Sequence, residues 1–385
     1  MPDTTELAEG AQPAEQRRVR ISSPTSLLAV IPPLLGFEPS EPSLVVIGTE
    51  STSAEVRITI RFDIPEGRIA AAVVGEAIGY LADNRVTAAA VVGYGPDCLV
   101  DPVAGEVLRR FPKAGIALVE VLRAHDHRYW SYVCANRGCC PPDGTPFDAK
   151  AHPAAAKFAG KPVLASRAAL AQTIAPVTGE EAGAMVRADR RAEARARRLV
   201  REAGNGTGRK AWRRALRGPG LLAVSEAIAL YREGQSLPSR NAAAWLALVL
   251  EELPVRDDAW ARMDPKHNAA HRRLWTDVTR LARPGYVAAP AALLAFTAWQ
   301  SGNGALANVA LDRALADQPG YSMARLLRQA LDCGAPPSVA RLPMTPEDVA
   351  ASYQAQYSEE EDGEVDSGSQ TGHDADDEQA AGLLS

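Results

Sequence analysis

The pattern of hydrophobic and polar positions divides the chain into a first part that contains strands and a second part that is helical. Apolar residues run without a break through Leu44–Thr49, as in a strand buried on both faces. Apolar and polar residues alternate through Val56–Phe62, as in a strand with one solvated face. The short polar stretch between them predicts a β-hairpin.

Two helices and three strands are predicted after this hairpin, in the order helix, strand, helix, strand, strand: Ile69–Leu81, Thr87–Val92, Val103–Phe111, Ile116–Leu122 and Tyr129–Val133. The resulting β-β-α-β-α-β-β order indicates an α/β domain with a mixed sheet. Ligands of such sheets bind beyond the carboxyl ends of strands. The candidate ligand-binding segments are therefore Gly93–Asp101 and His125–Arg128. The second of these is predicted to be the end of a strand at the surface. The apolar stretch before the hairpin is interrupted by prolines, and neither a helix nor a strand is predicted there.

Strand patterns stop after the middle of the chain, and helical periodicity continues to its last third. Helices are predicted over residues 180–203, 209–216, 221–233, 239–252, 267–282, 289–301, 304–316 and 321–332. Short loops containing Gly or Pro separate most of them. Helices of this length joined by short loops are typical of an antiparallel bundle or a solenoid.

One stretch of this helical part has the spacing of half a tetratricopeptide unit. Gly302, Ala307, Leu311, Ala314 and Pro319 stand where that repeat needs a tight turn, close helix packing and a helix end. A single unit matches, whereas about three are needed for a stable solenoid. We therefore expect an all-α C-terminal domain with tetratricopeptide-like packing.

These patterns predict five regions along the chain. They are a disordered segment over 1–20, an α/β domain over 21–133, a connector rich in Cys, Pro and Gly over 134–165, a helical domain over 166–341, and an acidic disordered tail over 342–385.

The charge distribution changes the picture given by the total. The 385 residues carry a net charge of −5, but residues 1–341 hold 42 Lys and Arg against 35 Asp and Glu, and residues 342–385 hold 12 Asp and Glu with no Lys or Arg. A body of charge +7 thus precedes a tail of charge −12. No apolar run reaches the roughly 18 residues of a membrane helix, and the acidic N-terminus is no signal peptide. We expect a cytoplasmic protein with reduced cysteines and no membrane partner.

The connector holds the main candidate for chemistry, a cluster of three cysteines. Cys134, Cys139 and Cys140 follow a predicted strand, and His127 lies just upstream. Together these four could provide the soft ligands of a zinc site. A disulfide or redox pair between Cys134 and either of the other two is a second reading, and thiols that only pack in a tight connector are a third. Cys333 is expected to be a small core residue.

The second candidate is a strongly basic segment. Arg187–Arg217 contains 12 Lys and Arg against 3 Asp and Glu. On a helix, Arg187, Arg191, Arg195 and Arg198 align along one side, which predicts anion binding by a surface suited to phosphates or acidic protein. A solvated Arg-Ala helix is the structural alternative. The acidic tail of the same chain is a further candidate partner for this segment.

Three stretches of the sequence resemble a known family. They are the run W-S-Y-V-C-x4-C-C-P-P-D-G-T-P over 130–146, the opening stretch over 23–48, which begins S-P-T-S-L-L-A-V-I-P-P-L-L-G-F, and the stretch over 292–315, which begins A-L-L-A-F-T-A-W-Q-S-G-N-G. All three are similar to the actinobacterial domain-of-unknown-function family 4192. The resemblance extends over roughly 22–335. It implies an origin in a high-GC actinobacterium or its phage or plasmid. It carries over no reaction, and supports only the following as motif members: Trp130, Cys134, Cys139, Cys140, Gly144 and Pro146.

Several common catalytic motifs do not occur in the sequence. It contains no G-x-S-x-G, P-loop, G-x-G-x-x-G or H-E-x-x-H motif. The leading hypothesis is therefore a non-catalytic interaction or adaptor protein with a protein partner. The alternatives are a metal-binding, thiol/redox or enzymatic protein centred on the cysteines, with the Gly93–Asp101 loop nearby, and a nucleic-acid-binding protein that uses 187–217.

Overall fold

The computed structural model describes residues 23–50, 56–64, 70–136, 138–156, 163–204, 208–335 and 344–354, and the statements below concern these residues. The predicted disordered segment 1–20 lies outside them. Six strands form one sheet in the order β2-β1-β3-β4-β5-β6: β1 (Ser43–Thr49), β2 (Val56–Asp63), β3 (Ala88–Tyr94), β4 (Ala117–His125), β5 (Arg128–Ser131) and β6 (Thr145–Pro146). β3 and β4 are parallel and the other pairs are antiparallel, which confirms the predicted mixed sheet.

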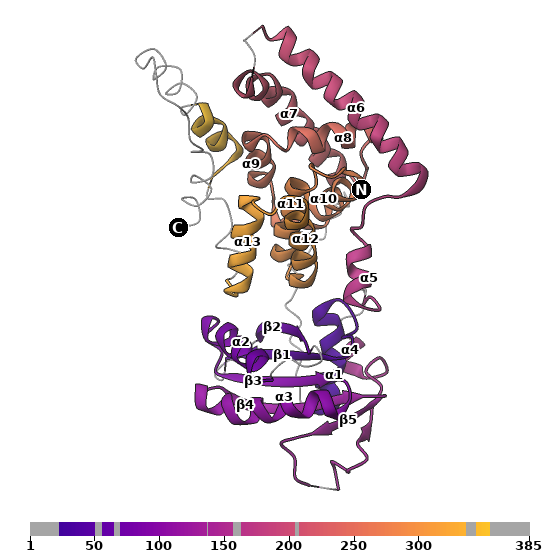
Figure 1. Ribbon diagram of the computed structural model, residues 1–385, viewed down its shortest axis with the longest axis vertical. Helices are drawn as coiled ribbons and strands as arrows, with labels where there is room; N and C mark the ends of the chain where they lie inside the picture. The colour runs from indigo at the N-terminus through magenta and orange to yellow at the C-terminus, as the bar shows by residue number, and fades with distance from the viewer. Residues whose placement is uncertain are drawn as a thin grey trace, which may run out of the picture.

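Both faces of the sheet are covered, which explains the unbroken apolar run of β1. Leu44 and Val46 pack with helices α2 (Ala70–Asp83) and α3 (Asp97–Arg110). Val45 and Ile47 point to the opposite face, because successive side chains of a strand alternate. Figure 1 shows the sheet with these helices in the lower half of the molecule.

The opposite face of the sheet packs against α1 (Pro24–Leu35), a helix that the sequence patterns did not predict. Ser23 caps it, since its hydroxyl accepts a hydrogen bond from the backbone N–H of Ser26, and Pro24 occupies the first turn. Two further prolines lie inside the helix, and Gly36, with φ +81°, ends it. These internal prolines hid the helix, because proline normally breaks one.

The second half of the chain is helical. After the short helix α4 (Pro153–Ala156), its helices are α5 (Arg167–Gln172), α6 (Gly179–Glu202), α7 (Arg209–Arg232), α8 (Arg240–Val249), α9 (Leu253–Ala261), α10 (Asn268–Leu281), α11 (Ala288–Gln300), α12 (Gly304–Asp317) and α13 (Ser322–Asp332). α11 is buried along nearly its whole length. The structure thus confirms an α/β part followed by a mostly helical part. Among the described residues, no helix combines the length and apolarity needed to cross a membrane.

Two helix boundaries differ from the prediction. Residues 209–216 and 221–233 form one helix, α7, which continues through Pro219. Residues 239–252 end earlier, and the unpredicted α9 follows at once. Tertiary packing favours the continuous α7, because Gly220 lets this helix approach its neighbours closely, whereas Pro254 in the first turn of α9 marks the start of a new helix. A Cβ atom on Gly220 would lie 2.7 Å from Val255 of α9.

The prediction of a disordered tail over 342–385 is wrong for residues 346–354, which are helical. Val349 is buried there, and Tyr353 donates a hydrogen bond from Oη to Asp257 Oδ2 of α9 at 2.5 Å. Packing against the body stabilises this short helix, which its own sequence would not. Residues 355–385 lie outside the described part.

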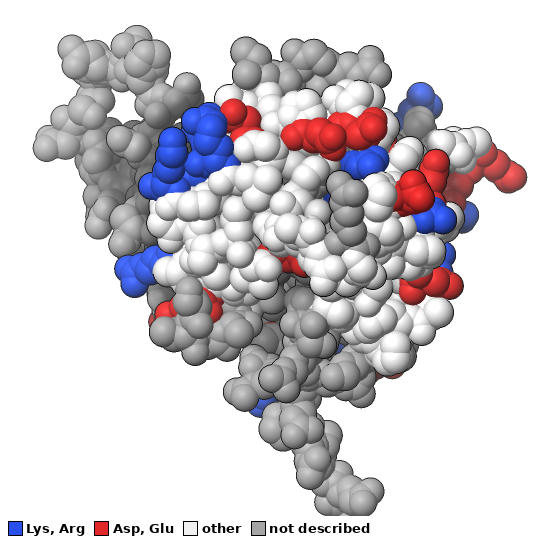
Figure 2. Space-filling view, turned by 90° about the horizontal axis from the view of Figure 1, so that it is seen from below, with Lys and Arg blue, Asp and Glu red and all other residues white. Residues whose placement is uncertain are grey.

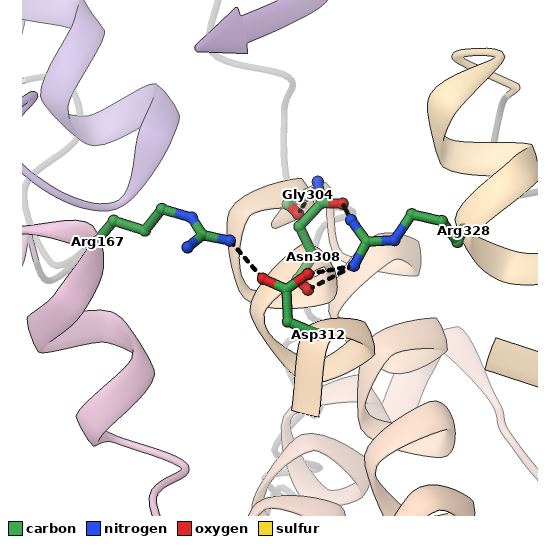
Figure 3. Close-up of polar contacts among 5 residues, drawn as sticks. All are labelled: Arg167, Gly304, Asn308, Asp312 and Arg328. Carbon is green, nitrogen blue, oxygen red and sulfur yellow. Dashed lines mark hydrogen bonds and ion pairs between the residues drawn. The ribbon is translucent and has the colours of Figure 1, made fainter. Parts of the chain in front are cut away.

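The two halves meet at α5 and α12. Arg167 of α5 and Arg328 of α13 each place Nη2 2.5 Å from a carboxylate oxygen of Asp312 on α12 (Figure 3). Arg328 also donates to the side-chain oxygen of Asn308, at 2.7 Å. Beneath this network, one continuous hydrophobic cluster runs from α1 and the sheet through Leu170 of α5 into the helical half.

Candidate metal centre

The cysteine loop, residues 131–146, packs against Trp130, near the end of β5. The indole Nε1 donates to the carbonyl oxygen of Pro142 at 2.9 Å, across the loop. Gly144 lies against the ring with φ +77°, and a Cβ there would come within 2.5 Å of the indole. Arg128 closes the loop by donating to the carbonyl oxygens of Asp143 and Gly144 at 3.0 and 2.8 Å. These hydrogen bonds and the close packing of Gly144 on Trp130 therefore hold the connector around the thiols in a compact conformation.

Replacing Gly144 by alanine is expected to destabilise this loop by about 2 kcal/mol, because alanine is strained at positive φ and its methyl group overlaps Trp130. The rate of limited proteolysis within 131–146 and the urea midpoint measure the effect. Gly105→Ala is the matched control. Gly105 lies on the exposed side of α3 with open space around it, so this change is expected to stabilise the protein by up to about 1 kcal/mol. Equal effects of both changes would contradict the prediction.

Three thiol groups meet on the loop. Cys134 Sγ lies 3.3 Å from Cys139 Sγ, which lies 3.8 Å from Cys140 Sγ, and all three sulfurs are within 4.8 Å of one another. The backbone N–H of Cys134 donates to Ser131 Oγ at 3.1 Å. The N–H groups of Cys139 and Cys140 both donate to the carbonyl oxygen of Asn136, at 3.3 and 2.8 Å. This turn is what brings the adjacent cysteines to one side.

The thiols differ in acidity. Hydrogen bonds from Cys140 and Cys139, and one from the backbone at Asn136, lower the pKa of Cys134. The pKa of Cys140 is raised to about 12 by its hydrogen bond with Cys134 and by partial burial. The cluster therefore favours one negative charge, on Cys134, stabilised by neighbouring thiols.

The structure does not place His127 among the thiols. Asp126 and His127 form the two-residue turn between β4 and β5, with φ of +48° and +58°, as a type I′ hairpin requires. The whole of β5 separates this turn from the cysteine loop, which is roughly 10 Å along the strand. In the described part of the chain, the cluster of potential metal ligands comprises the three cysteines alone.

The remaining polar groups near the loop connect it to the rest of the sheet. Tyr132 Oη donates to Asp101 of α3, so the Gly93–Asp101 segment does lie nearby, as expected. Arg123 stacks over the Trp130 ring at 3.7 Å. The loop projects from the lower end of the molecule in Figure 1, and Figure 2, seen from below, shows a mostly uncharged middle bordered by clusters of charged side chains. The expectation for Cys333 is wrong, because this residue caps the end of α13 and is exposed.

Only some of the predicted row of arginines on α6 have side chains that are available to bind another molecule. Arg187, Arg191, Arg195 and Arg198 are all exposed. However, Arg191 donates to an asparagine of α8 at 3.4 Å, and Arg195 stacks 4.0 Å above a tryptophan of that helix. Arg198 lies 3.6 Å from a glutamate one turn along α6. Half of the row therefore supports helix packing.

The basic segment also borders an open depression of about 780 Å³ between the end of α6 and the start of α7. It is lined by Arg197, Val200, Arg201, Gly204, Gly208, Arg209 and Trp212. Its three arginines suit an anionic ligand.

Sequence reasoning missed a group of buried charges on α9 and just before it. Glu252, Arg256, Asp257 and Asp258 expose at most 8% of their surface. Arg256 donates to Asp257 Oδ1 through Nε and Nη2, at 2.8 and 2.6 Å. The signal in the sequence was the run E-E-L-P-V-R-D-D directly after the apolar α8, where a solvated loop would be expected. When charges are buried and paired in this way, removing one partner strongly destabilises the fold.

The chain was compared with protein families and with characterised proteins. The family model described as a domain of unknown function, DUF4192, matches residues 24–338. The chain belongs to this family. Its DUF4192 region begins at the first residue of α1 and ends after α13, and thus includes the cysteine loop but not helix 346–354 or the acidic tail. The comparisons with curated proteins and with solved structures gave no match.

Proposed function

We propose that this DUF4192 protein binds a zinc-class metal ion through the thiolates of Cys134, Cys139 and Cys140. The distances between the sulfurs carry the proposal. Two thiolates at about 2.3 Å from one tetrahedral zinc are separated by about 3.8 Å. The observed separations of 3.3 and 3.8 Å, with all three sulfurs within 4.8 Å, require only small side-chain adjustments to reach that arrangement.

Three protein thiolates leave a fourth position for water or an added ligand. Sites with three protein ligands and one open position are the pattern of reactive or exchangeable zinc, whereas closed four-ligand sites are structural. The exposure of Cys139 and the partial exposure of the other two thiols give the ion and its fourth ligand access to solvent. The chemistry supported is thus the reversible binding of a thiophilic ion.

Metal analysis of the full-length protein, purified under reducing conditions and dialysed against zinc, tests the proposal. We expect about one zinc per chain, and cobalt replacing it should give thiolate-to-metal charge-transfer absorption. Changing Cys134, Cys139 or Cys140 singly to serine should lower zinc content at least about fivefold. Cys98→Ser and Cys333→Ser are matched controls, because both thiols are exposed and lie outside the cluster. Less than about 0.2 zinc per chain, or equal losses in the controls, would refute the site.

The 3.3 Å separation of Cys134 Sγ and Cys139 Sγ favours a second candidate, a dithiol–disulfide couple. In this reaction the two thiols form one S–S bond, and an external disulfide such as oxidised glutathione accepts the two electrons and two protons and becomes two thiols. Counting free thiols in the same samples distinguishes the candidates. A loss of two thiols in zinc-free protein exposed to oxidised glutathione supports the couple, and unchanged thiols exclude it.

The adaptor role also stays a proposal, attached to the helical half. Its support is the α11–α12 pair, in which Gly302 turns the chain with φ +73° and Ala307 and Ala314 are fully buried. A tight turn and small buried residues in this helix pair support the proposal of tetratricopeptide-like packing. A protein partner of this half would bind independently of the thiols.

A further inference from the structure

The first turns of α7 form a cationic surface. Five Lys and Arg, with no Asp or Glu, occur within nine residues, and we call them the α7 cation face: Arg209, Lys210, Arg213, Arg214 and Arg217. Positions three and four residues apart on a helix lie on the same side. The buried residues Ala211 and Leu216 occupy the other side. The charges are therefore gathered beside one another at the surface.

Helix 346–354 is anchored next to this face. Arg217 Nη2 donates to the carbonyl oxygen of Ala350 at 2.7 Å, and Tyr353 reaches Asp257 of α9. Val349 is 3% exposed, so the helix buries an apolar contact as well. In Figure 1 this short yellow helix lies beside α7 and α9. The described chain thus ends at Gln354, close to the α7 cation face.

The residues that follow are strongly acidic. Residues 355–385 contain ten Asp and Glu, from Glu359 to Glu378, and no Lys or Arg. A segment tethered this close to its target has an effective local concentration in the millimolar range. Opposite charges at that concentration attract one another until salt screens them.

We propose that residues 355–385 bind the α7 cation face of their own chain, with helix 346–354 as the tether. Charge complementarity and the position of Gln354 both favour this occupant over a separate molecule. The tail then competes with any other polyanion for the basic end of α7 and for Arg209, which also borders the depression between α6 and α7. Helix 346–354 and the tail lie outside the family region 24–338.

Carbodiimide cross-linking of the full-length protein tests the proposal, because it joins lysine amines to nearby carboxylates. We expect Lys210 to be linked to carboxylates between Glu359 and Glu378. The yield should fall at least about threefold when salt is raised to roughly 1 M, where the Debye length is about 3 Å. It should fall similarly in the variant Arg209→Gln/Arg214→Gln. Arg187→Gln/Arg190→Gln on α6 is the matched control, and should leave the yield unchanged.

The experiment also identifies other occupants. A mixture of ¹⁴N- and ¹⁵N-labelled protein shows whether each link joins one chain or two, and links between chains would overturn the proposal. Links that appear only after nuclease digestion would identify nucleic acid as the occupant and would also overturn it. The absence of Lys210 links in nuclease-treated, low-salt protein would do the same. Thermal melting of each variant verifies that the fold is retained.

Discussion

Replacing Arg256 by methionine is expected to lower the free energy of unfolding by about 3–5 kcal/mol, since it leaves Asp257 buried without its cation. Arg256 exposes 3% of its surface and Asp257 exposes 5%. Two nitrogens of the guanidinium bond the same carboxylate oxygen, and the other oxygen accepts from Tyr353. Methionine fills much of the same space, so the loss of charge pairing dominates. Urea unfolding followed by tryptophan fluorescence measures it, because five of the six tryptophans lie in the helical half.

The double variant Arg256→Met/Asp257→Leu separates charge from packing. It leaves no unpaired buried charge, so we expect it to be more stable than the single Arg256→Met variant, with a coupling energy of about 2 kcal/mol or more. Arg325→Met, an exposed arginine on α13, is the matched control and should change stability by less than about 0.5 kcal/mol. A single variant that loses less than about 1 kcal/mol would show that the pair is dispensable.

The contribution of Glu251 to the stability of the protein should fall as pH rises from about 4.5 to about 7. Burial, and then the charges of Asp317 and Glu252, raise its pKa to about 7, although Gln318 donates to one carboxylate oxygen at 3.3 Å. The folded state therefore binds this proton more tightly than the unfolded state, whose pKa is near 4.5. The stabilisation is complete below pH 4.5 and is lost by about pH 7, with a total of up to about 3 kcal/mol.

The Glu251→Gln variant isolates this contribution, because glutamine keeps the shape and the neutral state at every pH. Relative to wild type, the variant should gain up to about 3 kcal/mol between pH 4.5 and pH 8. Urea midpoints at several pH values measure the difference. Glu226→Gln on the exposed side of α7 serves as the control, and its curve should run parallel to wild type. Parallel curves for Glu251→Gln as well would refute the prediction.

The order of strands and helices from β1 to β5 could be predicted because each of these elements has a clear hydrophobic pattern. Leu44–Thr49 reads as a strand buried on both faces, and the structure covers it on both faces. Helix α1 could not be predicted, since its internal prolines are tolerated only where packing on the sheet outweighs their local cost. The join of residues 209–216 with 221–233 was hidden for the same reason, because Gly-Pro-Gly is a loop signal until α8 and α9 pack against it.

In the candidate site too, contacts between residues close in sequence could be predicted, whereas contacts that depend on the fold could not. The three cysteines are close in sequence, so their spacing was enough to bring them together, whereas His127 depends on hairpin geometry that spacing does not contain. The buried pair of Arg256 and Asp257 is adjacent in sequence, but its hydrogen-bond partner Tyr353 lies almost a hundred residues later. Contacts between distant segments decide burial, and a single sequence carries little record of them.

The continuous hydrophobic cluster through α5 has an evolutionary consequence. Leu170 and Ile174 are at most 5% exposed, in a chain of contacts that links the α1 face of the sheet to α12. A gene cut at this point would encode two products, each with an uncovered apolar face that promotes aggregation. Exchange of the α/β half or the helical half on its own, by recombination at this point, is therefore expected to give an unstable product.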